Sequence, residues 1–175
     1  MIIFANRKQL VRSLYKDARF ERMLYIGADV RRPTDYRTIR RIAAYIHVIE
    51  AWEPTVEVLR NSRLYDEVEH ADIASYEVPS TYDVIVWWHG PEHAAKADAV
   101  KILKHLPRCA PVVWIATPWG INEQGAIRGN PFNVHKSTWY PEDFELLGYA
   151  TGVCGVKNRL RSQLVGWICN EARSE

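Results

Sequence analysis

Two histidines and a glutamate stand together in the stretch HGPEH, at positions 89–93. The pattern H-x-x-E-H is a spacing of zinc peptidases, which need both imidazoles on one helix face and a third ligand elsewhere. Pro91 is tolerated in a first helical turn, and it disfavours helical geometry at Gly90. We therefore expect His89 to end a strand and His93 to point elsewhere from the next helix, with no metal bound. A zinc-dependent hydrolase stays as an alternative.

Two acids follow apolar runs at positions that suit a nucleoside ligand. Glu50 comes 23 residues after Gly27, near the spacing at which a carboxylate accepts hydrogen bonds from both hydroxyls of a ribose. Asp72 ends the run VEHADI and could accept the exocyclic amine of a base. Trp52 could lie against a purine face. Together these residues favour an adenosine-type ligand.

The elements that must position these residues alternate along the chain. Apolar runs predict five strands, at 22–26, 46–52, 68–73, 82–88 and 111–117. Helical spacing predicts helices at about 6–18, 33–45, 54–60, 91–106 and 141–148. Two final runs, 149–157 and 162–172, predict an antiparallel hairpin.

This alternation predicts an α/β fold, a three-layer sandwich around a mostly parallel seven-stranded sheet that ends in the antiparallel hairpin. Ligands of such sheets bind beyond the carboxyl ends of the strands. The length of 175 residues suits one domain, with its core at 22–172. The strand ends are therefore where we expect the functional residues.

Charge, apolar runs and cysteine spacing argue against several classes of protein. The net charge is +2 and no apolar run approaches the roughly 20 residues of a membrane span. The N-terminal stretch carries charges within any possible signal core, so we expect a cytoplasmic protein without membrane contact. The three cysteines form no C-x-x-C pair, which favours neither a disulfide framework nor a zinc ribbon.

Several motifs resemble the class I S-adenosylmethionine-dependent methyltransferases. They are MLYIGAD for the first glycine motif, HVIEAW for the ribose-binding acid, HADI for the adenine-side acid, YDVIVWWHG for the fourth strand and HKSTWYPEDFELLGY for the approach to the sixth. The C-terminal hairpin fits the same family, and the resemblance spans about Met23 to Glu171. The first motif is degenerate, because Tyr25 replaces its acid while Asp29 and Arg31 replace two glycines.

The resemblance implies S-adenosylmethionine as the cofactor and S-adenosylhomocysteine as the product. It implies that Glu50 holds the ribose, that Asp72 and Ile73 hold the adenine, and that Gly27 and Asp29 face the methionine portion. His89, at the exit of the fourth strand, becomes the candidate general base. The full set of expected cofactor contacts is Gly27, Ala28, Asp29, Glu50, Ala51, Trp52, Asp72, Ile73 and Trp88.

The segment 118–140 is rich in Gly, Pro and Asn, and a stretch of roughly 20 residues without clear secondary structure is often functional. It is the candidate lid over the methyl acceptor, which we expect to be a small polar molecule. An ordered loop packed by its own Trp and Phe is the alternative. The candidate acceptor-binding residues are Trp119, Glu123, Arg128 and His135.

Three other functions remain open at this point. The degenerate glycine motif favours a non-catalytic binding module that has kept the fold and lost the cofactor. The zinc hydrolase predicts stoichiometric metal. An oxidoreductase with a nicotinamide cofactor is disfavoured by the hairpin and by the lack of Gly-x-Gly-x-x-Gly. Arginine clusters at 31–41 and 157–161 keep RNA or protein acceptors open, and the sequence does not give the oligomeric state.

Overall fold

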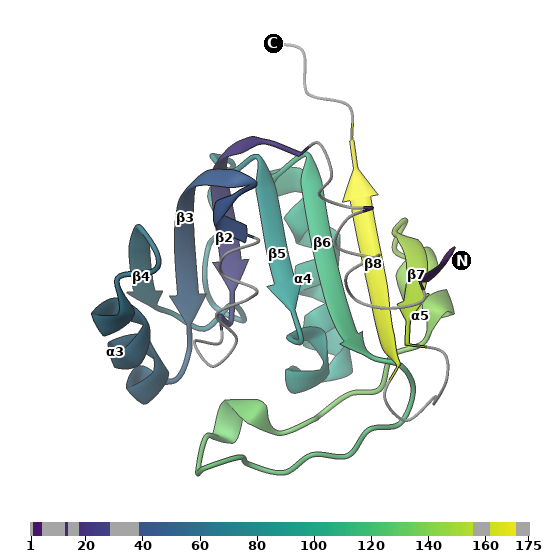
Figure 1. Cartoon of the computed structure of the whole chain (residues 1–175). Coiled ribbons are helices and arrows are strands. Elements are labelled where there is room, and N and C mark those ends of the chain that lie inside the picture. The colour runs from purple at the N-terminus through teal and green to yellow at the C-terminus, as the bar shows by residue number, and fades with distance from the viewer. Residues whose placement is uncertain (1, 5–12, 14–17, 29–38, 156–161, 171–175) are drawn as a thin grey trace.

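An eight-stranded sheet forms the centre of the computed structural model, which describes residues 2–4, 13, 18–28, 39–155 and 162–170 (Figure 1). The strand order is β1-β7-β8-β6-β5-β2-β3-β4. The strands are β1 (Ile2–Phe4), β2 (Phe20–Ile26), β3 (Ala43–Glu50), β4 (Glu67–His70), β5 (Val84–Trp88), β6 (Val112–Pro118), β7 (Ala150–Cys154) and β8 (Gln163–Cys169). The helices are α3 (Glu53–Ser62), α4 (Lys96–Cys109) and α5 (Pro141–Glu145), with 3-10 turns η1 (Pro91–His93) and η2 (Pro131–Asn133).

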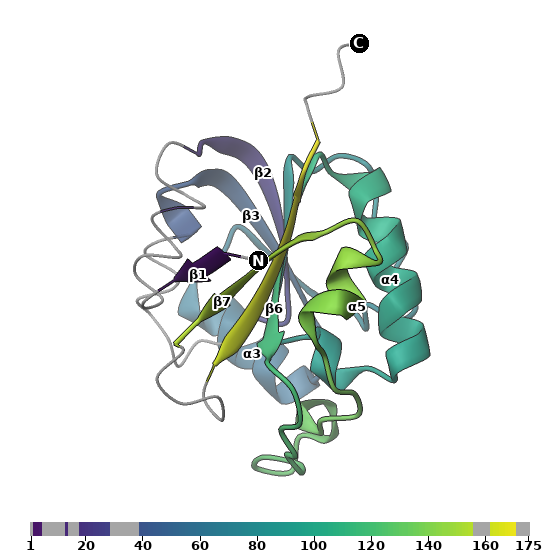
Figure 2. The ribbon, with the colours of Figure 1, turned by 90° about the vertical axis from the view of Figure 1, so that its right-hand side faces the viewer.

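The central strands are apolar on both faces because helices cover both sides of the sheet. Every residue of β5 is buried, which is typical of a central parallel strand. Leu59 of α3 belongs to the hydrophobic cluster on one face, whereas Leu103 of α4 and Phe144 of α5 belong to the cluster on the other. Figure 2 shows α4 and α5 together on one side of the sheet. The predicted three-layer α/β fold is confirmed.

The C-terminal hairpin is also confirmed. β8 runs antiparallel to both β6 and β7, and it lies between them. One strand was not predicted: β1 pairs in parallel with β7 at the edge of the sheet, where Phe4 packs closely over Gly152. The sheet therefore has eight strands instead of seven. The N-terminal helix predicted at about 6–18 falls almost wholly outside the described residues.

Two predicted helices differ from the structure. The helix expected over 91–106 is divided, because η1 ends at His93 and extended backbone at Ala94 and Ala95 precedes α4. Of the helix expected over 33–45, positions 33–38 lie outside the described residues, Ile39 and Arg40 are helical, and 43–45 are strand, because β3 pairs with β2 from Ala43 onward. The hydrogen bonds and apolar contacts of the ladder with β2 stabilise a strand here, although the spacing of the apolar residues is typical of a helix. None of the helices within the described ranges is long and apolar enough to cross a membrane.

Candidate functional site

A pocket of about 290 Å³ opens at the carboxyl ends of the parallel strands. In Figure 1 the arrowheads of β2 to β6 point to the lower edge of the sheet, where the long connection after β6 crosses. The pocket is lined from the ends of β2, β3, β4 and β5, from η1 and the start of α4, and from η2. Its position is the one at which doubly wound sheets bind their ligands.

Gly27 and Glu50 end two adjacent parallel strands at one side of the pocket. Gly27 has a left-handed backbone with φ of 69°, and a Cβ built on it would meet no atom within 4 Å. Its main chain is therefore accessible to a ligand at close range. Glu50 is only 9% exposed, and its Oε1 accepts a hydrogen bond of 2.8 Å from the N–H of Trp52. This bond fixes the orientation of the Glu50 carboxylate.

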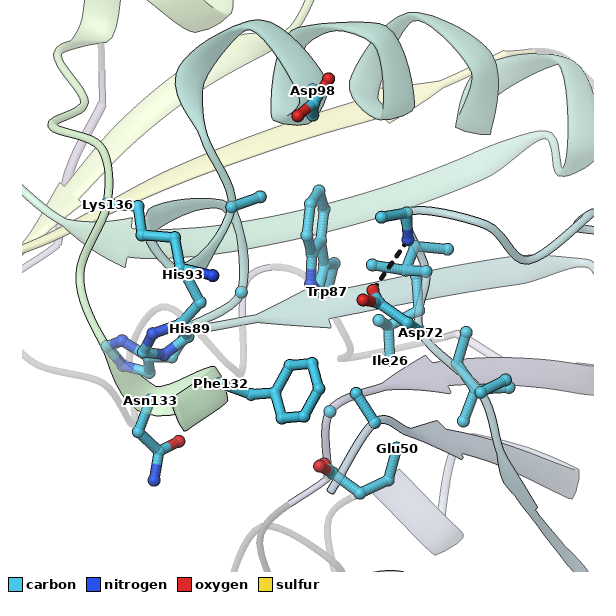
Figure 3. A pocket seen from close by; sticks show the side chains of 18 of the residues that line it. Ile26, Glu50, Asp72, Trp87, His89, His93, Asp98, Phe132, Asn133 and Lys136 are labelled. Carbon is cyan, nitrogen blue, oxygen red and sulfur yellow. Dashed lines mark hydrogen bonds between the residues drawn. The ribbon is translucent and has the colours of Figure 1, made fainter. Parts of the chain in front are cut away.

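Asp72 follows β4 in a tight turn on the same side. Its Oδ1 accepts a hydrogen bond of 2.9 Å from the N–H of Ala74, which is the dashed line in Figure 3. Its main-chain carbonyl accepts bonds of 3.0 Å from the N–H groups of Ser75 and Tyr76. The turn therefore holds the carboxylate at the pocket wall. We call the side formed by Gly27, Glu50 and Asp72 the acid half of the pocket.

The opposite side carries His89, His93 and Lys136, and we call it the imidazole half (Figure 3). His89 has a left-handed backbone with φ of 55°, which is uncommon for a residue with a side chain. Its Nδ1 lies 3.2 Å from Oε1 of Glu92, and its Nε2 lies 2.6 Å from Nε2 of Gln163. An ionised carboxylate has no hydrogen to donate, so the Glu92 carboxylate must accept the bond from His89. Nδ1 of His89 is therefore assigned the proton, and Nε2 accepts from the Gln163 amide.

His93 meets a third histidine beside the pocket. Its ring and that of His135 have centroids 5.0 Å apart. Burial lowers the pKa of His93, and the nearby Glu92 carboxylate opposes that shift only in part. The imidazole of His93 is therefore neutral near pH 7. HGPEH thus gives its two histidines different partners, but His93 does not point elsewhere as predicted, because both side chains line the same pocket.

The connection after β6, residues 119–140, is the segment predicted to be a lid, and we call it the lid segment. Its two ends meet where the N–H of Gly120 donates to the carbonyl of Trp139 over 2.9 Å. Near its far end, the N–H of Lys136 donates to the carbonyl of Glu92 over 2.7 Å, which ties the segment to η1. Asn130 is 5% exposed and caps η2, because its Oδ1 accepts from the N–H of Phe132 over 2.8 Å. This cap positions Phe132 in the pocket wall.

The structure brings together six of the residues predicted from sequence. Of the expected cofactor contacts, Gly27, Glu50, Ala51, Asp72 and Ile73 line the pocket, as does the candidate base His89. Ala28 and Trp88 are buried in the core on one face of the sheet, and Trp52 precedes α3 without lining the pocket. Asp29 lies outside the described residues.

The four candidate acceptor-binding residues lie along the lid segment but do not line the pocket. Glu123 and Arg128 are exposed, and Trp119 packs against the core. His135 does not line the pocket, and its ring lies beside that of His93. Their predicted contact with an acceptor stays a prediction.

Sequence reasoning missed Trp87 and Phe132. Side chains alternate across a strand, so Trp87 faces the pocket while Trp88, the expected contact, faces the opposite core. Gly90, two residues after the end of β5, was a sign in the sequence that a large side chain packs against the main chain there. In the structure a Cβ at Gly90 would lie 1.8 Å from Nε1 of Trp87, so only glycine leaves that ring in place. Phe132 was missed because a lid without periodicity gives no indication of which side chain points inward.

Comparison with known proteins rests on structure alone, because no protein-family model and no curated protein sequence matches this chain. The N-methyltransferase NodS from Bradyrhizobium japonicum WM9, in complex with S-adenosyl-l-homocysteine, is 10% identical, with coverage of 94% of this chain and 85% of NodS and a TM-score of 0.68. Magnesium protoporphyrin IX methyltransferase ChlM from Synechocystis PCC 6803, with bound SAH, is 14% identical, with coverages of 94% and 81% and a TM-score of 0.63.

A third structure, from Rhodobacter sphaeroides, is described as a putative Zn-dependent alcohol dehydrogenase. It is 10% identical, with coverage of 95% of this chain and 90% of its own and a TM-score of 0.69. Likeness at such identities establishes a shared fold and leaves activity to the site. The fold of this chain is therefore that of the class I methyltransferases, with the strand order of the sheet and its antiparallel hairpin as the defining features.

Proposed function

We propose that this protein transfers a methyl group from S-adenosylmethionine to an acceptor. The observation that supports this most directly is the acid half of the pocket, where the left-handed Gly27 and the carboxylates of Glu50 and Asp72 end adjacent parallel strands. The binding of S-adenosylhomocysteine by NodS and ChlM on the same fold supports the choice of cofactor.

In this proposal the acid half binds the adenosine portion. The Glu50 carboxylate, already oriented by Trp52, accepts the two ribose hydroxyls. Asp72 accepts the exocyclic amine of adenine, with Ile73 against the base. Gly27 allows the main chain to approach the methionine portion, and Asp29 is the predicted partner of its ammonium group. Ala51, beside Glu50 in the pocket wall, is a further proposed contact, whereas Ala28, Trp52 and Trp88 do not line the pocket.

His89 is the proposed general base. Methyl transfer requires mainly that acceptor and sulfonium are aligned, and a base helps where the acceptor loses a proton. Glu92 orients the His89 imidazole through Nδ1, which leaves the lone pair of Nε2 for proton transfer. The Gln163 amide donates a hydrogen bond to that lone pair. An acceptor hydroxyl or amine would take its place.

The acceptor is proposed to be small and polar, because the pocket of about 290 Å³ lies just below the usual range of small-molecule sites and the cofactor would take its acid half. Trp119, Glu123, Arg128 and His135 of that segment are its proposed contacts when the lid rearranges around it. RNA or protein acceptors would contact the lid from outside.

Calorimetric titration of the purified protein with S-adenosylmethionine and S-adenosylhomocysteine tests the proposal. We expect saturable binding of both at micromolar to tens of micromolar concentration. Replacement of His89 by Gln should leave both affinities within about twofold, because a base does not hold the cofactor. No binding of either ligand at millimolar concentration would favour the non-catalytic module instead.

A further inference from the structure

Glu92 is a buried carboxylate with a partner for only one of its oxygens. The residue is 2% exposed, and Oε1 lies 3.2 Å from Nδ1 of His89. Within the described part of the chain, Oε2 is buried and has no hydrogen-bond partner. An unsatisfied carboxylate oxygen in the interior is costly unless a proton or a cation satisfies it. Oε2 of Glu92 is therefore a candidate ligand atom for a cation.

Two imidazoles lie where such a group would be held. His93 follows Glu92 in η1, and His135 reaches the same point from the lid segment. One possible ligand atom from each of Glu92, His93 and His135 lies within 4.8 Å of the other two. Two chain segments that are 42 residues apart thus place a carboxylate and two imidazoles around one point.

Both imidazoles are oriented by main-chain carbonyl groups. Nδ1 of His135 contacts the carbonyl oxygen of Asn122, and Nδ1 of His93 lies 3.4 Å from that of Val134. A ring nitrogen that faces a carbonyl carries the proton, so Nε2 keeps its lone pair. Neither Nε2 has a hydrogen-bond partner among the described residues. In metal sites a histidine ligand commonly donates its other ring N–H to a carbonyl oxygen in this way, which fixes the tautomer and the orientation of the ring.

We propose that Glu92, His93 and His135 bind one divalent first-row transition metal ion, preferably Zn²⁺. Two neutral imidazoles and a carboxylate are ligands that suit zinc, with bonds of about 2.0–2.2 Å. Ligand atoms around such an ion lie roughly 3.4 Å apart, so the three side chains need only small rotations to close on it. The ion would join the lid segment to η1 next to the main-chain bond between Lys136 and Glu92.

This site differs from the one that H-x-x-E-H spells. That pattern takes both of its histidines as ligands, whereas His89 here is held by Glu92 and Gln163. HGPEH supplies Glu92 and His93, and the third ligand comes from the lid. Three protein ligands leave one coordination position open for water or another ligand, and of the three residues His93 lines the pocket. The sequence-based expectation that no metal binds considered only a site with both His89 and His93 as ligands.

Metal titration of the chelator-treated full chain tests the site. Zn²⁺ is titrated in competition with a chromophoric chelator, and Co²⁺ is followed by its visible absorption. We expect one equivalent of either metal and the intense bands of tetrahedral cobalt. At a hundredfold excess of Zn²⁺ over its Kd, we expect the Tm to rise by roughly 5 °C or more.

Matched glutamine variants assign the ligands. His93→Gln, His135→Gln and Glu92→Gln should each weaken Zn²⁺ binding by at least about tenfold, with circular dichroism confirming the fold. His105→Gln is the control, because His105 lies exposed on α4 beside Cys109, away from the pocket. It should bind Zn²⁺ as the wild type does.

Three results would overturn the proposal: no metal binding and no rise in Tm for the wild type, unchanged affinity in both His93→Gln and His135→Gln, or loss of binding in His105→Gln. The last would place the metal at an adventitious site on α4. None of these measurements uses S-adenosylmethionine, so their outcome is independent of the proposed methyl transfer.

Discussion

The acid half of the pocket rests on three neighbouring strands, whereas the imidazole half joins a strand exit, a 3-10 turn and the lid segment. On the acid side, the ladders between β2, β3 and β4 fix the main chain, and local bonds from Trp52 and Ala74 orient the two carboxylates. On the imidazole side, Gln163 contacts His89 together with the nearby Glu92, and carbonyl groups of the lid segment orient His93 and His135. Strand ends therefore set the position of the acids, and long-range contacts set that of the histidines.

The largest effect is expected where the two halves meet, at Gly90. In Gly90→Ala the new Cβ would collide with the ring of Trp87, which is 3% exposed and has little room to move. We expect a loss of about 2–3 kcal/mol in the free energy of unfolding, measured by denaturant titration. Gly125→Ala is the matched control, because a Cβ there meets no atom within 4 Å. Equal stabilities of the two variants would contradict the packing described for Trp87.

A smaller effect, on binding alone, is expected for Glu50→Gln. The amide oxygen can still accept from the N–H of Trp52, so the fold is kept while the charge is lost. We expect S-adenosylhomocysteine affinity to fall by about 1.5–3 kcal/mol, since a charge-assisted bond is lost. Glu57→Gln, on the exposed face of α3, should bind as the wild type. Unchanged calorimetric affinity in Glu50→Gln would remove Glu50 from the cofactor site.

The smallest effect is expected for Phe132→Ala, which tests whether the lid contributes to cofactor binding. Phe132 is 36% exposed, so its removal should change the unfolding free energy little. Loss of an aromatic contact with the ligand should weaken S-adenosylhomocysteine binding by about 1 kcal/mol. Leu146→Ala is the control, because Leu146 is 87% exposed and does not line the pocket. An affinity equal to that of the wild type would confine cofactor binding to the acid half.

The same difference between the halves explains what could be predicted from sequence. The acids were found because Glu50 and Asp72 each end an apolar run, and parallel strands end at one edge of a sheet. The neighbouring Trp88 was chosen in place of Trp87, because a continuous apolar run hides which side chain faces which layer. The predicted helix over 33–45 ignored the ladder with β2, which only tertiary pairing reveals.

The imidazole half was predictable only in part. The Gly-Pro step gives His89 and His93 different hydrogen-bond partners, but both side chains still line one side of the pocket. No local preference indicates that His135 returns to His93, or that Asn130 caps a turn to place Phe132. These contacts depend on the path of 22 lid residues, 119–140, whose course is set by the bonds at its ends and to η1.

The bond between Gly120 and Trp139 closes the lid segment at its neck. The loop between Gly120 and Trp139 can gain or lose residues without moving β6 or α5, since a doubling of loop length costs only about 0.6 kcal/mol in closure entropy. Insertions and deletions in this loop would therefore reshape the wall of the pocket while the sheet beneath keeps its architecture.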